Sequence, residues 1–209
     1  SVFLYYRDIL DDLVQKGGEM ESAPSRGEAH AEDLLQLLHS EIFARYREKQ
    51  SSVSTVLTGG NFNCVSSAVV YMLLNREFGY IVKGIATDDH AFCAVDTGMG
   101  MVDVETTNPM GFDPGSKKDF SDEFGNITGY SYVPPKNYRQ RNEISQIELI
   151  GLILQNRISA LEGYAKYENA FVLAVDRHGL ERSMKSAGEL YRSAVNFAAF
   201  FNNSQQYQD

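Results

Sequence analysis

A cysteine, a histidine and an acid in the middle third of the sequence are spaced so that they could act together in nucleophilic catalysis. Cys64 follows the polar segment Gly-Gly-Asn-Phe-Asn and begins an apolar stretch that runs to Phe78. At the first turn of a helix, unpaired backbone N–H groups and the helix dipole stabilise a thiolate, and the same groups can receive an oxyanion. We therefore predict that Cys64 is a nucleophile and that the adjacent Asn63 supplies a further donor to the oxyanion.

The histidine and the acid belong to consecutive predicted strands, 91–95 and 101–106. His90 directly precedes the first strand, and Asp103 and Glu105 share one face of the second. With a turn at the four residues after the first strand, Glu105 pairs with His90, and Asp103 is the diagonal neighbour of His90. Both acids are then within reach, and either would orient the imidazole and favour its charged form, which in turn would help to hold the thiolate.

The second cysteine, Cys93, is expected to have no part in this chemistry. Strand alternation places it on the face opposite His90, so we expect it in the core. The same alternation prevents Cys64, His90 and Cys93 from converging on a metal ion, and no loop alternates acids in an EF-hand pattern. The sequence therefore predicts neither a metal nor a cofactor.

Composition narrows the class of protein. The 209 residues include 19 Lys and Arg against 28 Asp and Glu, and the resulting net charge of −9 argues against a nucleic-acid partner. The longest apolar run, Ala68–Leu74, is far too short to span a membrane, and the hydrophobic fraction of 43% is typical of a globular protein. Because the chain begins with Ser1 in a segment typical of a helix, we expect a processed or trimmed chain, and the compartment stays open.

The elements around these residues predict an α+β fold. Helices are expected at 2–16, 29–49 and 64–78, and strands at 80–86, 91–95, 101–106 and, as an edge strand, near 130–133. The third helix is apolar on nearly all sides and should be buried. A helix followed by antiparallel strands gives α+β order rather than βαβ order. His30 and His39 fall on different sides of the second helix, and we expect them to be solvated or capping residues rather than ligands.

Together these residues resemble the core of the transglutaminase-like superfamily. The matching segments are Gly60-Asn-Phe-Asn-Cys-Val-Ser-Ser67, Asp89-His-Ala-Phe-Cys-Ala-Val95 and Met101-Val-Asp-Val-Glu-Thr-Thr-Asn-Pro109. The resemblance implies a central helix packed on an antiparallel sheet and a papain-like triad, with Cys64 as nucleophile, His90 as general base and acid, and Asp103 as the orienting group. The sequence has no Trp, so any Trp that family members use beside the nucleophile is absent, which favours hydrolysis over protein cross-linking.

Two tyrosines follow a long segment rich in Gly, Pro, Asp and Asn. Tyr130 and Tyr132 could line a substrate groove, or they could be ordinary aromatic residues of an edge strand. The sequence leaves both alternatives open.

The last third of the chain is helical, with helices expected at 147–161, 164–176 and 183–201. Residues 152–171 resemble a single tetratricopeptide-type helix pair with Gly163 and Tyr164 at the turn. Such a pair cannot bury its apolar face alone, so we expect it to pack on the core or on a protein partner. The predicted organisation is a catalytic core with N-terminal helices at 1–145 and a helical extension at 146–209.

Two functions are compatible with these features. The first is a cysteine-dependent amide hydrolase or acyltransferase that acts on a peptide or protein through a thioester. The second is a non-catalytic interaction module that keeps the same fold. A Cys64 sulfur within reach of a His90 ring nitrogen would favour the enzyme, whereas packed side chains between the two residues would favour the module.

Overall fold

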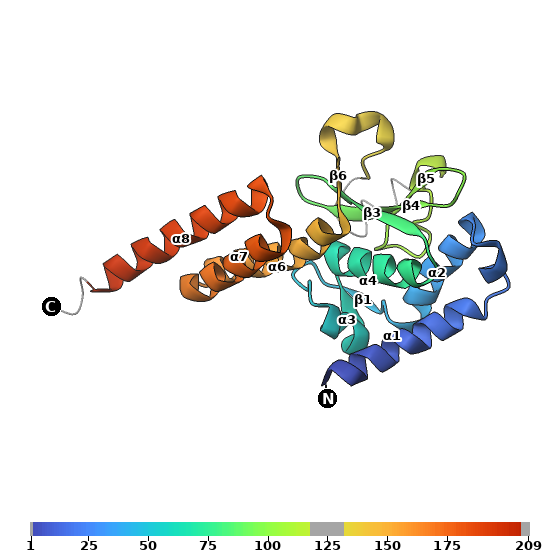
Figure 1. The fold of residues 1–209 in the computed structure, drawn as a ribbon, viewed down its shortest axis with the longest axis horizontal. Coiled ribbons are helices and arrows are strands. Elements are labelled where there is room, and N and C mark those ends of the chain that lie inside the picture. Colours follow the sequence, from blue (N-terminus) through green and yellow to red (C-terminus); the bar gives the residue numbers. More distant parts are fainter. Residues whose placement is uncertain (1, 118–131, 206–209) are drawn as a thin grey trace. The chain divides into compact units, whose positions relative to one another are not determined.

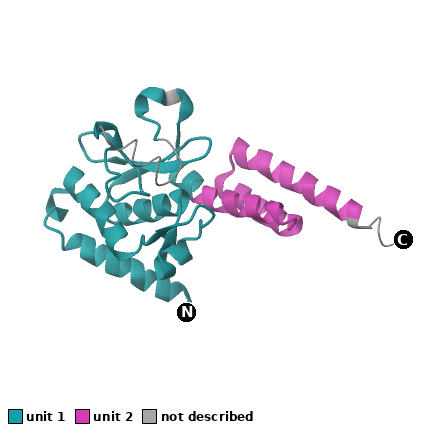
Figure 2. Ribbon diagram, turned by 180° about the vertical axis from the view of Figure 1, so that it is seen from behind, with its two compact units in different colours: residues 1–149 teal, residues 150–209 magenta. Residues whose placement is uncertain are grey.

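The fold consists of two compact units. The computed structural model describes residues 2–117 and 132–205. Unit 1 comprises residues 1–149 and unit 2 comprises residues 150–209, shown in teal and magenta in Figure 2. The predicted boundary lay between residues 145 and 146, whereas the division falls within a helix that begins at Gln146. Within the described residues, no helix is both long and apolar enough to cross a membrane.

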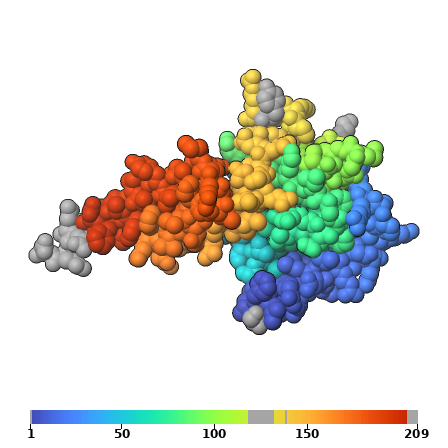
Figure 3. Space-filling view, viewed as in Figure 1, coloured from blue at the N-terminus to red at the C-terminus, as the bar shows by residue number. Residues whose placement is uncertain are grey.

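Unit 1 combines helices with a sheet, which confirms the predicted α+β class. Its helices are α1 (Val2–Gly18), α2 (Glu28–Glu41), α3 (Val53–Gly59) and α4 (Cys64–Glu77), and its 3-10 turns are η1 (Ala23–Ser25), η2 (Pro114–Ser116) and η3 (Pro135–Gln140). In the space-filling view α1, in dark blue, lies at the surface of the unit (Figure 3), and at its start Val2 and Phe3 are more than two-thirds exposed.

The second helix ends earlier than its sequence pattern predicts. We expected it to run to residue 49, but α2 stops at Glu41. The backbone then turns away, and the N–H groups of Ala44 and Arg45 both donate to the carbonyl of Gly60 at 2.9 Å. The next residues form β1 (Arg45–Tyr46), which pairs in parallel with β2 (Asn61–Phe62). This tertiary pairing competes with continuation of the helix.

Four antiparallel strands form the main sheet of unit 1 in the order β5-β4-β3-β6 (Figure 1). They are β3 (Ile81–Ala86), β4 (Ala91–Asp96), β5 (Met101–Val104) and β6 (Asn142–Ile144). The edge strand expected near 130–133 is not observed where it can be assessed, because residues 132 and 133 belong to no strand and residues 130 and 131 lie outside the described part. The edge of the sheet next to β3 is formed by β6.

The hairpin between β4 and β5 has a different register from the predicted one. Asp96 still belongs to β4 and pairs with Met101, so the loop comprises residues 97–100. In this loop Gly98 and Gly100 adopt positive φ angles, which glycine tolerates best. As a result Asp103 pairs with Ala94, two residues further along β4 than we expected.

Helix α4 is the centre of unit 1, as its apolar pattern predicts. One side faces the sheet, where the Cys93 thiol donates to the carbonyl of Ala68 at 3.4 Å. Another side faces α2, where the Tyr71 hydroxyl donates to the carbonyl of Ala31 at 3.0 Å. In Figure 1 the sheet lies on one side of α4, and α1 lies on the other. A helix buried in this way is a rigid support for a side chain at its first position.

Unit 2 is built from three helices, α6 (Gln146–Gly163), α7 (Tyr167–Glu181) and α8 (Met184–Gln205), with the start of α6 belonging to unit 1. Its apolar core contains Ile158, Ala170 and Ala174, with Leu161, Leu173 and Leu190 packed against them. The break between α6 and α7 follows Gly163, where the sequence placed a turn. In this core, α8 packs against the pair formed by α6 and α7.

Candidate active site at the start of α4

Cys64 is the first residue of α4, and local capping fixes this position. The side chain of Asn63 accepts from the backbone N–H of Ser66 at 3.0 Å, and the Ser66 hydroxyl accepts from the backbone N–H of Asn63 at 2.9 Å. This reciprocal pair is a capping box, which specifies where a helix begins. Cys64 therefore lies among the first-turn N–H groups of a buried helix, and 8% of its surface is exposed.

The imidazole of His90 lies between the cysteine and an acid. His90 sits in the turn before β4, where its backbone N–H donates to the Thr87 hydroxyl at 3.0 Å. Its Nε2 is 2.6 Å from Oε2 of Glu105, and the Cys64 side chain is close enough to the ring to raise its pKa. Because Nε2 is bonded to Glu105, a proton exchanged with the sulfur would have to pass through Nδ1. The structure thus forms the line Cys64, His90, Glu105.

The charge of this line is set by its buried neighbours. Burial alone would lower the pKa of His90, but the Glu105 carboxylate and the nearby Cys64 side chain outweigh it, and the pKa rises from 6.5 to about 10. The His90 and Glu105 side chains are almost completely buried, with exposures of 1% and 0%. In a low-dielectric setting an opposite charge at this distance strongly favours the ionised pair. His90 is therefore an imidazolium at neutral pH.

The acid that contacts His90 is Glu105, which corrects the role of orienting group that the resemblance implied for Asp103. Asp103 is bound elsewhere: Nη1 and Nη2 of Arg141 donate to its two carboxylate oxygens at 2.6 and 2.8 Å. The Tyr132 hydroxyl also donates to Asp103, at 2.6 Å. The physical reason is the shifted register of the hairpin, which moves Asp103 along β4 away from His90. Our sequence reasoning kept Glu105 as a competitor, and the geometry selects it.

Tyr132 lies beside the site without contacting the reactive atoms in any described interaction. The Tyr132 ring packs against the Phe92 ring, with centroids 5.7 Å apart. The guanidinium of Arg141 lies over the Phe92 ring, 5.2 Å from its centroid. Phe92 in turn stacks on His90, with centroids 6.1 Å apart. Burial and the bond to Asp103 raise the pKa of Tyr132, so it remains a neutral phenol. Tyr130, the other predicted groove residue, lies outside the described residues.

Asn63 does not point a free amide at the cysteine, contrary to our expectation of an oxyanion donor. Its Nδ2 donates to the carbonyl of Glu48 at 2.8 Å and to the hydroxyl of Ser51 at 2.9 Å. Its Oδ1 accepts from the Ser66 backbone, as described above. A side chain with all of these partners is a helix cap, so the donors available to an oxyanion at Cys64 are the first-turn backbone N–H groups of α4.

Cys93, His30 and His39 are held by packing and hydrogen bonds within unit 1. Cys93 is fully buried, and burial strongly raises the pKa of its thiol, as expected for a core cysteine. His30 is buried rather than solvated, and its ring is bonded to the Tyr80 hydroxyl and the carbonyl of Gly17. His39 is half-buried, and its Nε2 lies 3.1 Å from the carbonyl of Thr106, directly after Glu105. The helical pattern did not predict these burials because it does not specify what a helix packs against.

Thr107 is a site residue that the sequence reasoning missed. Its backbone N–H and its hydroxyl both donate to Oε1 of Glu105, at 3.2 and 2.8 Å. The preceding Thr106 bonds to Ser67 on α4 through their hydroxyls, at 2.8 Å. The available signal was the Thr-Thr pair immediately after an acid, since a threonine two residues after a carboxylate can form such a turn.

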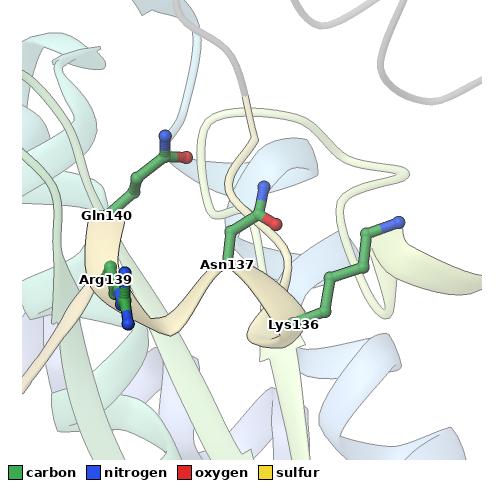
Figure 4. A pocket seen from close by; sticks show the side chains of 4 residues that line it. All are labelled: Lys136, Asn137, Arg139 and Gln140. Atoms are coloured by element: carbon green, nitrogen blue, oxygen red, sulfur yellow. The ribbon is translucent and has the colours of Figure 1, made fainter.

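A pocket of about 270 Å³ lies elsewhere in the chain, along η3. Figure 4 shows its four lining side chains, Lys136, Asn137, Arg139 and Gln140, all from the same short segment. None of them belongs to the Cys64 line, so this pocket does not describe the space in front of the sulfur.

The described residues contain no group of three or more His, Cys, Asp or Glu side chains arranged to hold a metal ion. The side chains gathered at the start of α4 are those of a cysteine, an imidazolium and a carboxylate. Comparison of the chain with protein-family models, with curated proteins and with solved structures finds no match.

Proposed function

We propose that this protein is a cysteine-dependent amide hydrolase or acyltransferase that acts through Cys64, His90 and Glu105. The observation that carries the proposal is the buried contact at 2.6 Å between Glu105 and one ring nitrogen of His90, next to Cys64 at the start of a buried helix. Covalent catalysis typically uses a nucleophile, a base beside it and a third group that orients the base. Structural ion pairs can be buried too, but they do not need a thiol at a helix N-terminus.

We further propose a transglutaminase-like core for unit 1. Support comes from the order of its parts: a central helix that begins with the cysteine, followed by antiparallel strands that supply the histidine and then the acid. The acid is Glu105 rather than the Asp103 that the resemblance implied. A glutamate is one methylene longer, which lets it reach the imidazole from a position further along the chain.

The first half of the reaction forms a thioester. The Cys64 thiolate attacks the carbonyl carbon of an amide, a C–S bond forms, and the oxyanion faces the first-turn N–H groups of α4. His90 then donates its Nδ1 proton to the amide nitrogen, the C–N bond breaks, and the amine leaves. Throughout this step Glu105 stabilises the imidazolium and keeps Nδ1 directed at the reacting atoms.

The second half releases the acyl group. Neutral His90 takes a proton from water, or from a second amine, as that nucleophile attacks the thioester carbonyl. The C–S bond breaks, the thiolate re-forms, and the product is an acid or a new amide. We propose a peptide or protein as the substrate, and hydrolysis as the favoured outcome because the chain has no Trp to shield a thioester from water.

Labelling with a thiol-reactive amide mimic, such as a peptidyl chloromethyl ketone, tests the proposal. We expect rapid modification of Cys64, located by peptide mass spectrometry, and its abolition in Cys64→Ala and His90→Gln. Cys93→Ala is the matched control and should label like wild type, because Cys93 is fully buried. Equal labelling of both cysteines in the folded protein, or unchanged labelling in His90→Gln, would contradict the proposal.

A non-catalytic interaction module is the second candidate function, and the surface of unit 2 favours it. Large apolar side chains on its helices are exposed, namely Val172, Val175, Leu180, Met184, Tyr191, Val195, Phe200 and Phe201. Exposed apolar surface of this kind is typical of protein–protein contacts. In this case the unlabelled protein would hydrolyse no peptide substrate even if Cys64 can be labelled, whereas substitutions such as Tyr191→Ser would weaken a protein contact and leave the labelling unchanged.

A further inference from the structure

The carboxylate of Glu105 is held from two sides. Oε2 contacts Nε2 of His90 at 2.6 Å, and Oε1 accepts from the hydroxyl of Thr107 at 2.8 Å and from its backbone N–H at 3.2 Å. Glu105 is fully buried and Thr107 is almost fully buried. Because no solvent reaches this carboxylate, its orientation depends on these protein donors.

The turn that carries Thr107 is itself anchored. The Thr106 carbonyl lies 3.1 Å from Nε2 of His39, and the Thr106 hydroxyl is 2.8 Å from that of Ser67 on α4. The Glu105 backbone N–H donates to the carbonyl of Gly111 at 2.7 Å. The main chain on both sides of the acid is therefore attached to α2, to α4 and to the following loop.

We infer that Thr107 is a positioning residue for the triad, which holds the Glu105 carboxylate in line with His90. The inference rests on the proposed function. Thr107 acts through Glu105 and has no described contact with Cys64 or His90. When both Oε1 donors are present, the carboxylate cannot rotate without breaking two hydrogen bonds, so Oε2 stays directed at Nε2.

The titratable groups that face this arrangement come from four parts of the fold. Cys64 faces His90 from α4, and Glu105 faces it from the residue after β5. Cys93 on β4 faces Glu105, and burial together with that carboxylate raises the pKa of its thiol, so Cys93 stays neutral. His39 faces Glu105 from α2, and burial lowers the pKa of His39 from 6.5 to about 4 despite that carboxylate, so His39 is neutral near pH 7. A change in the pKa of His90 therefore reports on its interactions with Glu105 and Cys64, and not on His39.

The test compares three variants with wild type. Thr107→Val removes the hydroxyl and keeps the shape and the backbone donor, and Thr107→Ser keeps the hydroxyl. Thr106→Val is the matched control, since the hydroxyl of this neighbouring buried threonine bonds to Ser67 and not to Glu105. Each protein is measured for the rate of Cys64 modification by the peptidyl reagent, for the NMR titration of the His90 ring, and for unfolding in urea.

We expect Thr107→Val to slow Cys64 modification by about 10- to 100-fold, the range that follows from losing a hydrogen bond to a charged group. We also expect its His90 titration to move to lower pH, because a carboxylate that is free to rotate stabilises the imidazolium less. Thr107→Ser should restore both values. Thr106→Val should lose stability and move the His90 titration less than Thr107→Val does, because the turn keeps its bonds to His39 and to Gly111.

The inference fails if the His90 titration of Thr107→Val stays at or above that of wild type, or if Thr106→Val moves it equally, because the role of Thr107 would then be structural. The two proposals are separable. If wild-type Cys64 shows no enhanced reactivity while Thr107→Val still lowers the His90 titration, positioning of Glu105 stands and the proposed catalysis fails.

Discussion

Asp103 and Glu105 are buried acids two residues apart, yet their partners give them different roles. Asp103 receives two bonds from Arg141 and one from Tyr132, which makes it the attachment point for residues 132–141. Glu105 receives bonds from Thr107 and contacts His90. A buried charge whose partner is removed is strongly destabilising, because the desolvation cost is no longer offset. Substitution of each acid should therefore have a distinct signature.

We predict that Glu105→Gln and Asp103→Asn separate these roles. Glu105→Gln should lower the pKa of His90 towards its ordinary value, because the carboxylate that raises it is gone, and should slow Cys64 modification by about 100-fold or more. Asp103→Asn should reduce the free energy of unfolding by about 3–5 kcal/mol and leave the His90 titration in place. NMR titration and urea unfolding measure the two effects. A His90 titration that moves in Asp103→Asn and not in Glu105→Gln would reverse the assignment.

At the scale of elements, the loop after β5 determines the position of Glu105. The chain leaves β5, turns through residues 105–108, and returns so that Phe112 bridges to Val104. Gly111 lies against the turn so closely that a Cβ at this position would be 1.9 Å from the Glu105 carbonyl oxygen and 2.8 Å from that of Asn108. Both contacts are with backbone atoms of the turn that begins at Glu105, and the closer one is with Glu105 itself.

Gly111→Ala should therefore disturb the site from outside it. We expect a loss of at least about 2 kcal/mol in the free energy of unfolding, as for other overpacked sites, together with slower Cys64 modification. Gly188→Ala on α8 is the control for an added methyl group, since a Cβ there meets nothing within 4 Å. That control should be neutral or stabilising by up to about 1 kcal/mol. Equal stability of the two variants in urea would show that the loop can relax.

At the scale of the whole molecule, each unit contains its own buried ionic contacts. Unit 1 has the pairs of His90 with Glu105 and of Asp103 with Arg141. In unit 2, Arg177 is bonded to Glu181 on its own helix and to Glu189 on α8. Such pairs tie stability to pH more closely than an apolar core does, because their charges must persist for the fold to persist.

We predict that unit 1 is most stable near pH 6.5. Between about pH 4 and 6.5 the unfolded chain binds a proton at His39 that the folded chain excludes, so stability rises with pH, by up to about 3 kcal/mol. Between pH 6.5 and about 10 the folded chain keeps a proton on His90 that the unfolded chain releases, so stability falls as pH rises. Urea unfolding across this range should give a maximum, and His39→Gln should flatten its acid side while His90→Gln flattens its alkaline side. A monotonic rise in stability from pH 5 to 9 would contradict this assignment.

The elements around Cys64 could be predicted because they depend on local patterns. The all-round apolar run after residue 64 predicted α4, and alternation predicted the three strands that follow it. α2 was predicted too long and β6 was not predicted, since both outcomes depend on distant partners. The carbonyl of Gly60 accepts hydrogen bonds from the backbone N–H groups of residues 44 and 45. The partner of β3 at the sheet edge is β6, which lies about sixty residues further along the chain.

By itself the sequence determined that a cysteine would begin a buried helix and that a histidine would precede the neighbouring strand, because capping and periodicity are encoded within a few residues. Only the tertiary structure decided which acid meets the imidazole. That choice depends on a register shift of two residues in one hairpin and on Arg141, which lies 38 positions after the aspartate that it binds. The tertiary structure also showed that Thr107 and Gly111 contact Glu105. Contacts with a carboxylate or with a backbone oxygen leave no periodic pattern in the sequence, so neither residue could be predicted from periodicity.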